Sequence, residues 1–301
     1  MLMRSKVVGH TVVLVTALAA AVILLAVGGM MLNILLGGWE KLTWEFLTGV
    51  PTQGMTEGGI FPAIVGTFLL VVIMSIFSVP VGTVTAIYLS EYASQKSKVA
   101  QMIRFAVNTL AGVPAIVFGL FGLGFFIQFV GRGIDQLLLG EFELKWGQPN
   151  ILWASLTMAL LTLPVVIVSV EEAMKTVPRE LREASYALGA TRWETIQKVV
   201  LPHSFTGILT GGILAVSRGA GEVAPILFTG AAYFLPHLPQ SLSDQFMELG
   251  YHVYIMSTQS PDVEATRGIL YATTLVLLLL TFLLNFSAIF LRYKVRKRQT
   301  R

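Results

Sequence analysis

"AVSRGAGEVAP", residues Ala215 to Pro225, decides how many times this chain crosses a membrane. It places an arginine and a glutamate, Arg218 and Glu222, inside a stretch that is otherwise uncharged and mostly apolar from residue 205 to residue 235. If a bilayer tolerates these two charges, the stretch is long enough to be a membrane-spanning helix. The chain then has six such helices, because five other apolar runs carry no charge at all.

The composition is that of a membrane protein. Of the 301 residues, 54% are hydrophobic and 13% are charged, whereas about a quarter of the residues of a soluble domain are charged. Each uncharged run exceeds the roughly 20 apolar residues that a helix needs to cross the hydrocarbon core. These runs cover residues 7–39, 58–90, 105–131, 146–170 and 268–291. Together with residues 205–235 they predict an all-α, polytopic membrane protein with six transmembrane helices embedded in a lipid bilayer.

The first run is predicted to remain in the mature protein. It follows Arg4 and Lys6, as a secretion signal would, but it continues well past the roughly 7 to 15 apolar residues of a signal core. We therefore expect an uncleaved anchor. The predicted organisation is an anchor helix with its outer loop at 1–57, a membrane core at 58–292 that contains a cytoplasmic loop at 171–205, and a basic cytoplasmic tail at 293–301.

Residue types that serve catalysis or metal binding are scarce. Cysteine is absent, which excludes disulfides and thiolate metal sites. The histidines His10, His203, His237 and His252 show no ligand spacing, so we expect them at interfaces or in loops. The chain also lacks the Gly-x-x-x-x-Gly-Lys-Ser/Thr cradle for nucleotide phosphates. We predict no catalytic residue, no metal and no cofactor, and any energy from ATP has to come from another subunit.

Lysine and arginine are distributed unequally between alternate loops, which predicts the orientation. One set of segments carries sixteen of these residues, and the other set carries only Lys41, Arg132, Lys145 and Arg267. By the positive-inside rule both termini and the loop 171–205 are cytoplasmic. The same asymmetry explains the isoelectric point of 9.3 without a nucleic-acid partner. The predicted outer loops carry ten acidic residues, so their field repels an anion that arrives directly from solution.

The longest cytoplasmic segment, VPRELREASYALGATRWETIQKVVLP (Val177–Pro202), predicts two helices joined at a glycine; we call it the knob. Pro178 suits the first helical position and Gly189 the position just after the helix end. Thr191 and Glu194 have the spacing of a capping box, which starts the second helix. Alternating acids and bases favour a protein partner over anionic lipids. One narrow face of the first helix carries Leu181, Ala184, Ser185 and Leu188.

Within the knob, EASYALG and VVLP resemble the cytoplasmic loop signature of ABC importer permeases. That signature reads Glu-Ala-Ala, three residues, Gly, nine residues and Ile-x-Leu-Pro. Ser185 and Val199 depart from it, in place of an alanine and an isoleucine. The resemblance implies the type I importer permease fold, in which this loop is the coupling helix that docks on a cytoplasmic ATPase. The matching positions are Glu183, Ala184, Gly189, Leu201 and Pro202, and with Ser185 they form the predicted coupling site.

Three further stretches look like the permease subunits of phosphate importers, and in particular like the second of their two permeases. They are GTVTAIYLSEYA (Gly82–Ala93), NTLAGVPAIVFGLFGLGFF (Asn108–Phe126) and SRGAGEVAPILFTGAA (Ser217–Ala232). The resemblance implies a second permease, either a paralogue or a copy, two cytoplasmic ATPase subunits and an extracytoplasmic phosphate-binding protein. Delivery by such a binding protein would overcome the repulsion by the acidic outer loops.

Arg218 and Glu222 are the predicted substrate-pathway residues. They lie four residues apart on one helical face, near the bilayer centre if their helix begins near Thr206. One interpretation is that they neutralise each other. The other is that Arg218 is a transient anion site, because a guanidinium binds two phosphate oxygens at once, while Glu222 competes and keeps the binding weak. Phosphate carries up to two negative charges, whereas this chain offers one arginine within the membrane. We therefore also predict a second permease that contributes another arginine.

The sequence therefore predicts a non-enzymatic permease subunit of an ATP-driven phosphate importer, which forms half of the translocation pathway. Two alternatives remain open. One is a permease of the same architecture for another oxyanion, such as phosphonate, sulfate or molybdate. The other is a self-sufficient secondary transporter or channel, which would have no use for the knob.

Overall fold

The computed structural model describes residues 2–53, 56–94, 96–140, 144–260 and 262–299. The outer-loop acid Glu141 and the end of the predicted basic tail, residues 300–301, lie outside these ranges. The described part of the chain is mostly helical. Its one regular sheet is a two-stranded antiparallel hairpin in which Pro51 pairs with Gly58.

The elements alternate between long helices and short connecting ones. The first part of the chain contains α1 (Leu2–Gly38), η1 (Trp39–Lys41), α2 (Trp44–Thr48), β1 (Pro51–Thr52), β2 (Glu57–Gly58), α3 (Phe61–Ile87), η3 (Tyr88–Tyr92), α4 (Lys98–Ala111), α5 (Ala115–Phe121), η4 (Gly122–Gly131) and α6 (Arg132–Leu138). The second part contains α7 (Ile151–Lys175), α8 (Arg179–Ala187), α9 (Arg192–Thr195), η5 (Ile196–Val200), α10 (Leu201–Gly219), α11 (Leu249–Thr258) and α12 (Val263–Gln299).

Six helical segments of the described chain are long and apolar enough to cross a membrane, which confirms the predicted number. Four of them begin and end within five residues of the predicted runs. The third and the fifth differ by more, and both differences have a local cause given below. The segments are Thr11–Lys41, Phe61–Tyr92, Ala115–Leu138, Ile151–Lys175, Arg192–Gly219 and Val263–Lys294.

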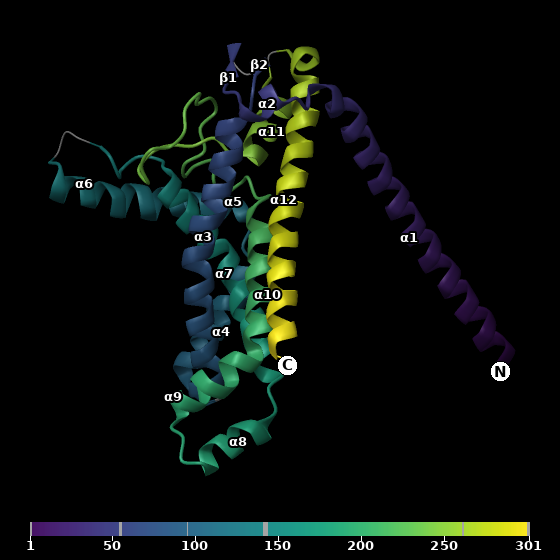
Figure 1. Cartoon of the computed structure of the whole chain (residues 1–301), viewed down its shortest axis with the longest axis vertical. Coiled ribbons are helices and arrows are strands. Elements are labelled where there is room, and N and C mark those ends of the chain that lie inside the picture. The colour runs from purple at the N-terminus through teal and green to yellow at the C-terminus, as the bar shows by residue number, and fades with distance from the viewer. Residues whose placement is uncertain (1, 54–55, 95, 141–143, 261, 300–301) are drawn as a thin grey trace.

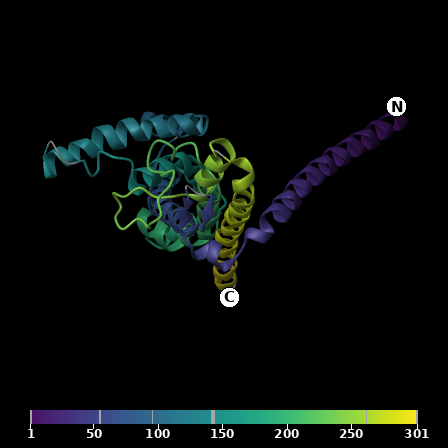
Figure 2. The ribbon, with the colours of Figure 1, turned by 90° about the horizontal axis from the view of Figure 1, so that it is seen from above.

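Helices α3, α7, α10 and α12 stand side by side and form the body of the molecule (Figure 1). Within this bundle α7 is the most enclosed helix, with 67% of its apolar window buried. By contrast, α1 leans away from the bundle, and none of its apolar window is buried (Figure 2). One end of the bundle carries the knob and is called the α8 end; the opposite end carries α11 and the hairpin and is called the α11 end.

Both chain ends lie toward the α8 end. The first residues of α1 and the last residues of α12 both reach the level of the lower bundle, although α1 stands well apart from it (Figure 1). The two termini therefore share one side of the fold, as an even number of spans requires. That this side is cytoplasmic stays a prediction from the distribution of lysine and arginine.

The third span begins later than predicted. The run 105–131 is interrupted because α4 ends at Ala111 and α5 begins only at Ala115. Gly112 follows the end of α4, and Pro114 has an extended backbone with ψ of 139°, which a helix interior does not permit. Helix α4 is thus a separate amphipathic helix, and the span runs from Ala115 to Leu138.

The fifth span also differs from its predicted run. Instead of continuing from residue 205 to residue 235, the helix begins at Arg192 and ends at Gly219. The capping box at Thr191 starts it early, and η5 joins α9 to α10 without a break. After Gly219 the chain passes through turns as far as Gly230. The prediction of one helix through Glu222 is therefore wrong.

The chain after α10 folds back into the bundle core. Ile226 and Phe246, from this irregular stretch, are fully buried in one cluster with Met74 of α3 and Met158 of α7. The backbone pairs across the stretch, because the Ala232 amide donates to the Phe246 carbonyl at 2.8 Å. The turns after Gly219 are therefore part of the packed interior.

Glycines on α10 bring it close to its neighbours. A β-carbon on Gly207 would lie 2.1 Å from the Ala173 β-carbon of α7, and one on Gly219 would lie 2.5 Å from the Met74 sulfur of α3. Both positions serve helix packing. Gly221 differs, because a β-carbon there would meet no atom within 4 Å.

Candidate functional site

Arg218 lies in the last turn of α10, where the helix stops. Its Nε atom is 3.7 Å from the Glu222 Oε1 atom, and 41% of the arginine side chain and 29% of the glutamate side chain are exposed. This separation is longer than a hydrogen bond. No hydrogen bond to the guanidinium is found within the described part of the chain. The partial negative charge at the end of a helix favours a cation at this position.

The Arg218 side chain opens into a pocket of about 290 Å³ between α4 and α7. Arg218 supplies the charge in it, and Asn108 and Ser169 supply polar side chains. The lining from α7 spans the middle of that helix, so the pocket lies at mid-height of the bundle. The other lining residues are Val107, Ala111, Leu161, Pro164, Val165 and Val168.

The structure brings Arg218 and Glu222 near each other without locking them together. Gly221, between them, has free space around it. Pro225, predicted to disturb a helix at this depth, instead follows the helix end and packs against α5, where its carbonyl would lie 2.9 Å from a β-carbon on Gly119. The residues that face Arg218 from α4 were not predicted, because that prediction treated α4 as part of a span.

The knob forms as the local sequence predicts. Helix α8 ends in a left-handed turn at Gly189, which has φ of 83°. The Gly189 amide donates to the Tyr186 carbonyl, and the Ala190 amide donates to the Ser185 carbonyl, which is the hydrogen-bond pair of a Schellman motif. The predicted capping box of Thr191 and Glu194 is present and begins α9.

The predicted coupling residues fall into two groups. Four lie on α8 or its corner, and Leu201 and Pro202 lie in the first turn of α10. No residue of α8 is buried, and Leu188 is 89% exposed. Trp193, which the sequence did not single out, is 53% exposed beside it. Large exposed apolar side chains of this kind mark a protein interaction surface. The four residues on α8 and its corner are Glu183, Ala184, Ser185 and Gly189.

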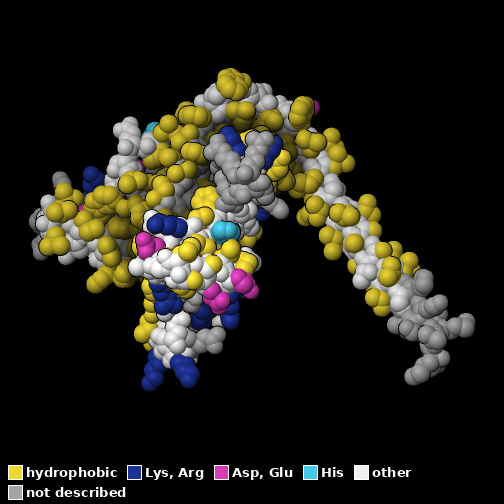
Figure 3. Space-filling view, turned by 60° about the horizontal axis from the view of Figure 1, so that its bottom comes forward, with side chains coloured by type: hydrophobic (Ala, Val, Ile, Leu, Met, Phe, Trp, Pro, Cys, Tyr) yellow, Lys and Arg dark blue, Asp and Glu magenta, His cyan; other side chains and the backbone are white. Residues whose placement is uncertain are grey.

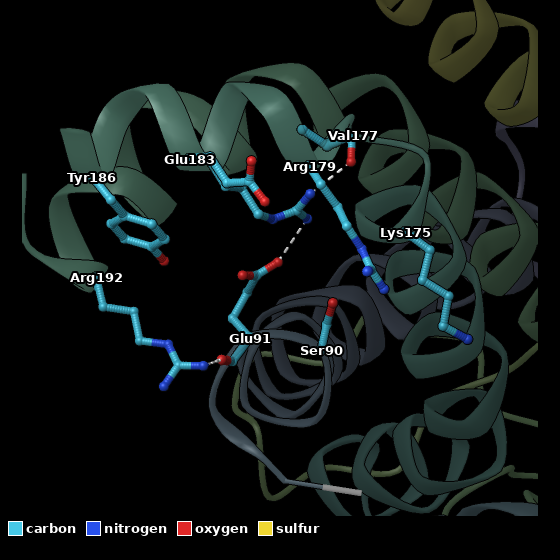
Figure 4. Close-up of a pocket in the computed structure, with 9 residues that line it drawn as sticks. Ser90, Glu91, Lys175, Val177, Arg179, Glu183, Tyr186 and Arg192 are labelled. Carbon is cyan, nitrogen blue, oxygen red and sulfur yellow. Dashed lines mark hydrogen bonds and ion pairs between the residues drawn. The ribbon is translucent and has the colours of Figure 1, made fainter. Parts of the chain in front are cut away.

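Charged residues gather at the α8 end, as a view onto that end shows (Figure 3). A pocket of about 510 Å³ lies between α8 and η3 (Figure 4), and one of about 680 Å³ lies beside it. Glu91 and Glu171 are nearly buried there, with side chains 7% and 8% exposed. Glu91 pairs with Arg182 at 2.8 Å, and Glu171 pairs with Arg104 at 2.5 Å. Neither glutamate was assigned a role from the sequence, although each stands at the end of an apolar run.

A buried acid and a buried histidine lie at the α11 end. Glu248 caps α11 and accepts hydrogen bonds from the Gly250 and Tyr251 amides, and burial raises the pKa of its carboxyl to about 7. His252 is 3% exposed, and burial lowers the pKa of its imidazole to about 4. The expectation that this histidine lies at an interface or in a loop is wrong, because α11 folds into the core beside α3.

Comparison with known proteins places these features in a family. Residues 78–300 match the family of binding-protein-dependent transport system inner membrane components. The chain is 30% identical to the probable ABC transporter permease protein YqgI of Bacillus subtilis, over 94% of each chain. It is 37% identical to the phosphate transport system permease protein PstA of Yersinia pestis, over 67% of this chain and 59% of that protein.

Solved structures share the fold at low sequence identity. A bacterial ABC transporter involved in the import of the acidic polysaccharide alginate matches with a TM-score of 0.66 and 15% identity, over 96% of this chain and 98% of that chain. The MetNI methionine ABC transporter in an inward-facing conformation matches with a TM-score of 0.54 and 16% identity, over 85% of this chain and 98% of that chain.

The family match covers most of the chain, and the six apolar helices agree with it. The protein is thus a multi-pass protein of the inner membrane. The type I importer fold predicted from the knob is confirmed by the solved structures. This chain belongs to the binding-protein-dependent transport system inner membrane components and is a permease subunit of an ABC importer.

Proposed function

We propose that this permease imports phosphate, as one half of the translocation pathway of an ATP-driven importer. The observation that carries the proposal is the Arg218 guanidinium, which opens into a pocket at mid-height of the bundle and is held only loosely by Glu222. A guanidinium presents a planar fork of donors that matches two oxygens of a phosphate. A site of this kind binds an oxyanion briefly because a nearby carboxylate competes for the same donors.

The relatives support phosphate over other anions. Phosphate transport system permeases named PstA match this chain at 32% to 39% identity over 56% to 70% of its length. Those matches cover only 50% to 64% of each relative's own length, so the substrate of this chain is a proposal. Glu222 favours phosphate further, because its carboxylate can accept a hydrogen bond from a protonated phosphate oxygen, which ionised sulfate lacks.

The proposed partners follow from the surfaces of the chain. The exposed α8 face and the first turn of α10 dock on a cytoplasmic ATPase, so ATP is hydrolysed on two separate subunits. A second permease, a paralogue or a copy, supplies the other half of the pathway and a second cation. An extracytoplasmic phosphate-binding protein delivers the anion. The chain itself needs no cofactor. Residues 1–57 form the anchor with its outer loop, residues 58–292 form the membrane core, and residues 293–301 form the cytoplasmic tail.

Uptake of radiolabelled phosphate tests the proposal. Arg218→Ala and Arg218→Lys are expressed with the partner subunits from neighbouring genes, and co-purification verifies assembly. We expect uptake to fall about a hundredfold in the alanine variant and to stay low in the lysine variant, because an ammonium lacks the two-donor fork. Arg132→Ala, at an exposed position on α6, is the matched control.

Two results contradict the proposal. Near-normal uptake in an assembled Arg218→Ala complex removes Arg218 from the pathway. Competition by unlabelled sulfate, molybdate or phosphonate, stronger than by phosphate, assigns the permease to another oxyanion. Failure of the chain to co-purify with any ATPase, in contrast, supports a self-sufficient transporter.

A further inference from the structure

Three arginines from three helices converge on the end of α3. Arg104 of α4 donates to the Leu89 carbonyl at 3.1 Å, and Arg192 of α9 donates to the Glu91 carbonyl. Arg182 of α8 pairs with the Glu91 carboxylate at 2.8 Å. Leu89 and Glu91 both belong to the π-helical turn η3, where the helix ends and its last carbonyls lack amide partners. The guanidinium groups satisfy those carbonyls.

The pair of Glu91 and Arg182 is enclosed. Their side chains are 7% and 17% exposed, respectively. The Arg182 guanidinium also donates to the Val177 carbonyl at 2.6 Å and to the Met174 carbonyl at 3.0 Å. This one side chain therefore joins α8, the end of α7 and η3. Figure 4 shows the Glu91 carboxylate directed toward α8, with Arg192 reaching the backbone of Glu91 from the other side.

Helix α8 has little else to fix its direction. None of its residues is buried, so apolar burial contributes little to its position. A hydrogen bond of 2.9 Å between the hydroxyls of Ser185 and Thr195 joins it to α9, which is part of the same knob. Among the described residues, the ion pair of Arg182 with Glu91 joins α8 to η3, the turn that follows α3.

Through Arg104, the cluster of arginines around η3 is also connected to the pocket of Arg218. Arg104, fastened to the Leu89 carbonyl, lies on α4 on the same face as Val107, Asn108 and Ala111, which follow it by three, four and seven residues. Those three residues line the pocket into which Arg218 opens. A displacement of α8 thus reaches the pocket through two short steps, from Arg182 to Glu91 and from Leu89 to Arg104.

We propose that Glu91 is a positioning residue that couples the movement of α8 to α3 and α4, and thereby to the pocket of Arg218. The proposal rests on the proposed function in one respect, namely that α8 is the helix on which an ATPase acts. Glu91 touches neither ATP nor cargo. It acts by holding Arg182, so that η3 and α4 follow when α8 is displaced.

A double-mutant cycle in the assembled transporter tests this coupling. Glu91→Gln and Arg182→Gln are compared singly and together, in sealed proteoliposomes, by phosphate uptake per ATP hydrolysed. We expect about a tenfold fall in this ratio in each single variant, while ATP hydrolysis continues. The double variant should be no worse than either single one, because both remove the same contact. Glu172→Gln is the control, since its side chain is 65% exposed and pairs only at the surface.

A second measurement is independent of the cargo. The chain has no cysteine, so spin labels can be attached specifically at Ser94→Cys, just after η3, and Glu180→Cys, on α8. We expect one narrow distance distribution with and without ATP when Glu91 is present. In Glu91→Gln the distribution should broaden, because α8 then moves independently of η3. This result stands even if phosphate proves to be the wrong cargo, since it needs no transported anion.

Two results overturn the proposal. One is an unchanged label distance in Glu91→Gln, and the other is an unchanged uptake per ATP in that variant. If Glu91→Gln fails to assemble, Glu91→Asp replaces it, because the shorter side chain keeps the charge but withdraws it from Arg182. The aspartate variant should broaden the label distance as well, and an unchanged distance in it refutes the role of Glu91.

Discussion

Arg182 at the α8 end and Arg218 in the middle of the bundle each stand beside a glutamate, yet the two are held in opposite ways. Arg182 is 17% exposed, lies 2.8 Å from Glu91 and donates to two carbonyls as well. Arg218 is 41% exposed and lies 3.7 Å from Glu222. The same pair of residue types thus fastens helices in one region and leaves a guanidinium open to a pocket in the other.

The largest expected effect is on stability at the α8 end. Arg182→Ala leaves the nearly buried Glu91 carboxylate without its cation, so we expect the free energy of unfolding to fall by about 3 to 5 kcal/mol. Chemical unfolding in detergent micelles measures it. An unchanged free energy of unfolding would show that Glu91 finds another partner and would remove the contrast between the two arginines.

Arg218→Ala should leave stability nearly unchanged but reduce transport. Because its guanidinium makes no hydrogen bond within the described residues, we expect the free energy of unfolding to change by less than about 0.5 kcal/mol. Phosphate uptake should nevertheless fall about a hundredfold. Parallel unfolding and uptake measurements on one preparation test this split. A large loss of stability would mean that Arg218, like Arg182, is structural.

Two glycines, one inside α10 and one just after its end, allow the packed and the open regions to be compared again. Gly207→Ala puts a β-carbon 2.1 Å from the Ala173 β-carbon, so α10 and α7 have to separate, and we expect a loss of about 1 to 3 kcal/mol. A β-carbon introduced by Gly221→Ala, just after the end of α10, meets nothing within 4 Å, so this variant should be neutral. Equal losses in thermal unfolding of both variants would contradict the packing observed on α10.

Glu248 extends the comparison to a buried acid that has no cationic partner among the described residues. Burial raises its pKa from 4.5 to about 7, so its contribution to stability is lost as pH rises through that interval. Burial lowers the pKa of His252 from 6.5 to about 4, so its contribution is lost as pH falls through that interval. Between about pH 4.5 and 6.5 the two effects oppose each other.

Glu248→Gln should therefore isolate the effect of Glu248. We expect the stability of the variant, relative to the unmodified chain, to rise with pH by about 1.4 kcal/mol per unit between pH 4.5 and 6.5. Taking the difference removes the contributions of all other titrating groups. A flat difference would show that Glu248 is ionised in the folded protein, as a carboxylate paired with arginine would be.

Much of the fold could be predicted because its causes are local. Hydrophobic runs predicted six spans, and the described part of the chain has six helical segments that could cross a membrane. Gly189, Thr191 and Glu194 predicted the corner of the knob, because a left-handed turn and a capping box each depend on a few neighbouring residues. The end of α4 was missed, since an apolar run by itself does not distinguish one helix from two. Gly112 and Pro114 carried that signal.

The site could be predicted only in part. Arg218 and Glu222 were identified from their charge in an apolar stretch, and their pocket role stays a proposal. Glu91 was overlooked although it stands in the quoted stretch YLSEYA, because its significance depends on Arg182 and Arg192, which are 91 and 101 residues away. Such partners are unrelated in sequence, so no local pattern identifies them.

By itself, the sequence determined that this protein spans a bilayer, the number of helices that cross it and the position of the turn in the knob. Each of these follows from the hydrophobicity or backbone preference of short segments. The tertiary structure alone decided which arginine is engaged and which is open. Coulomb attraction and hydrogen bonding act over only a few ångströms, so the packing of distant helices determines which carboxylate each guanidinium meets.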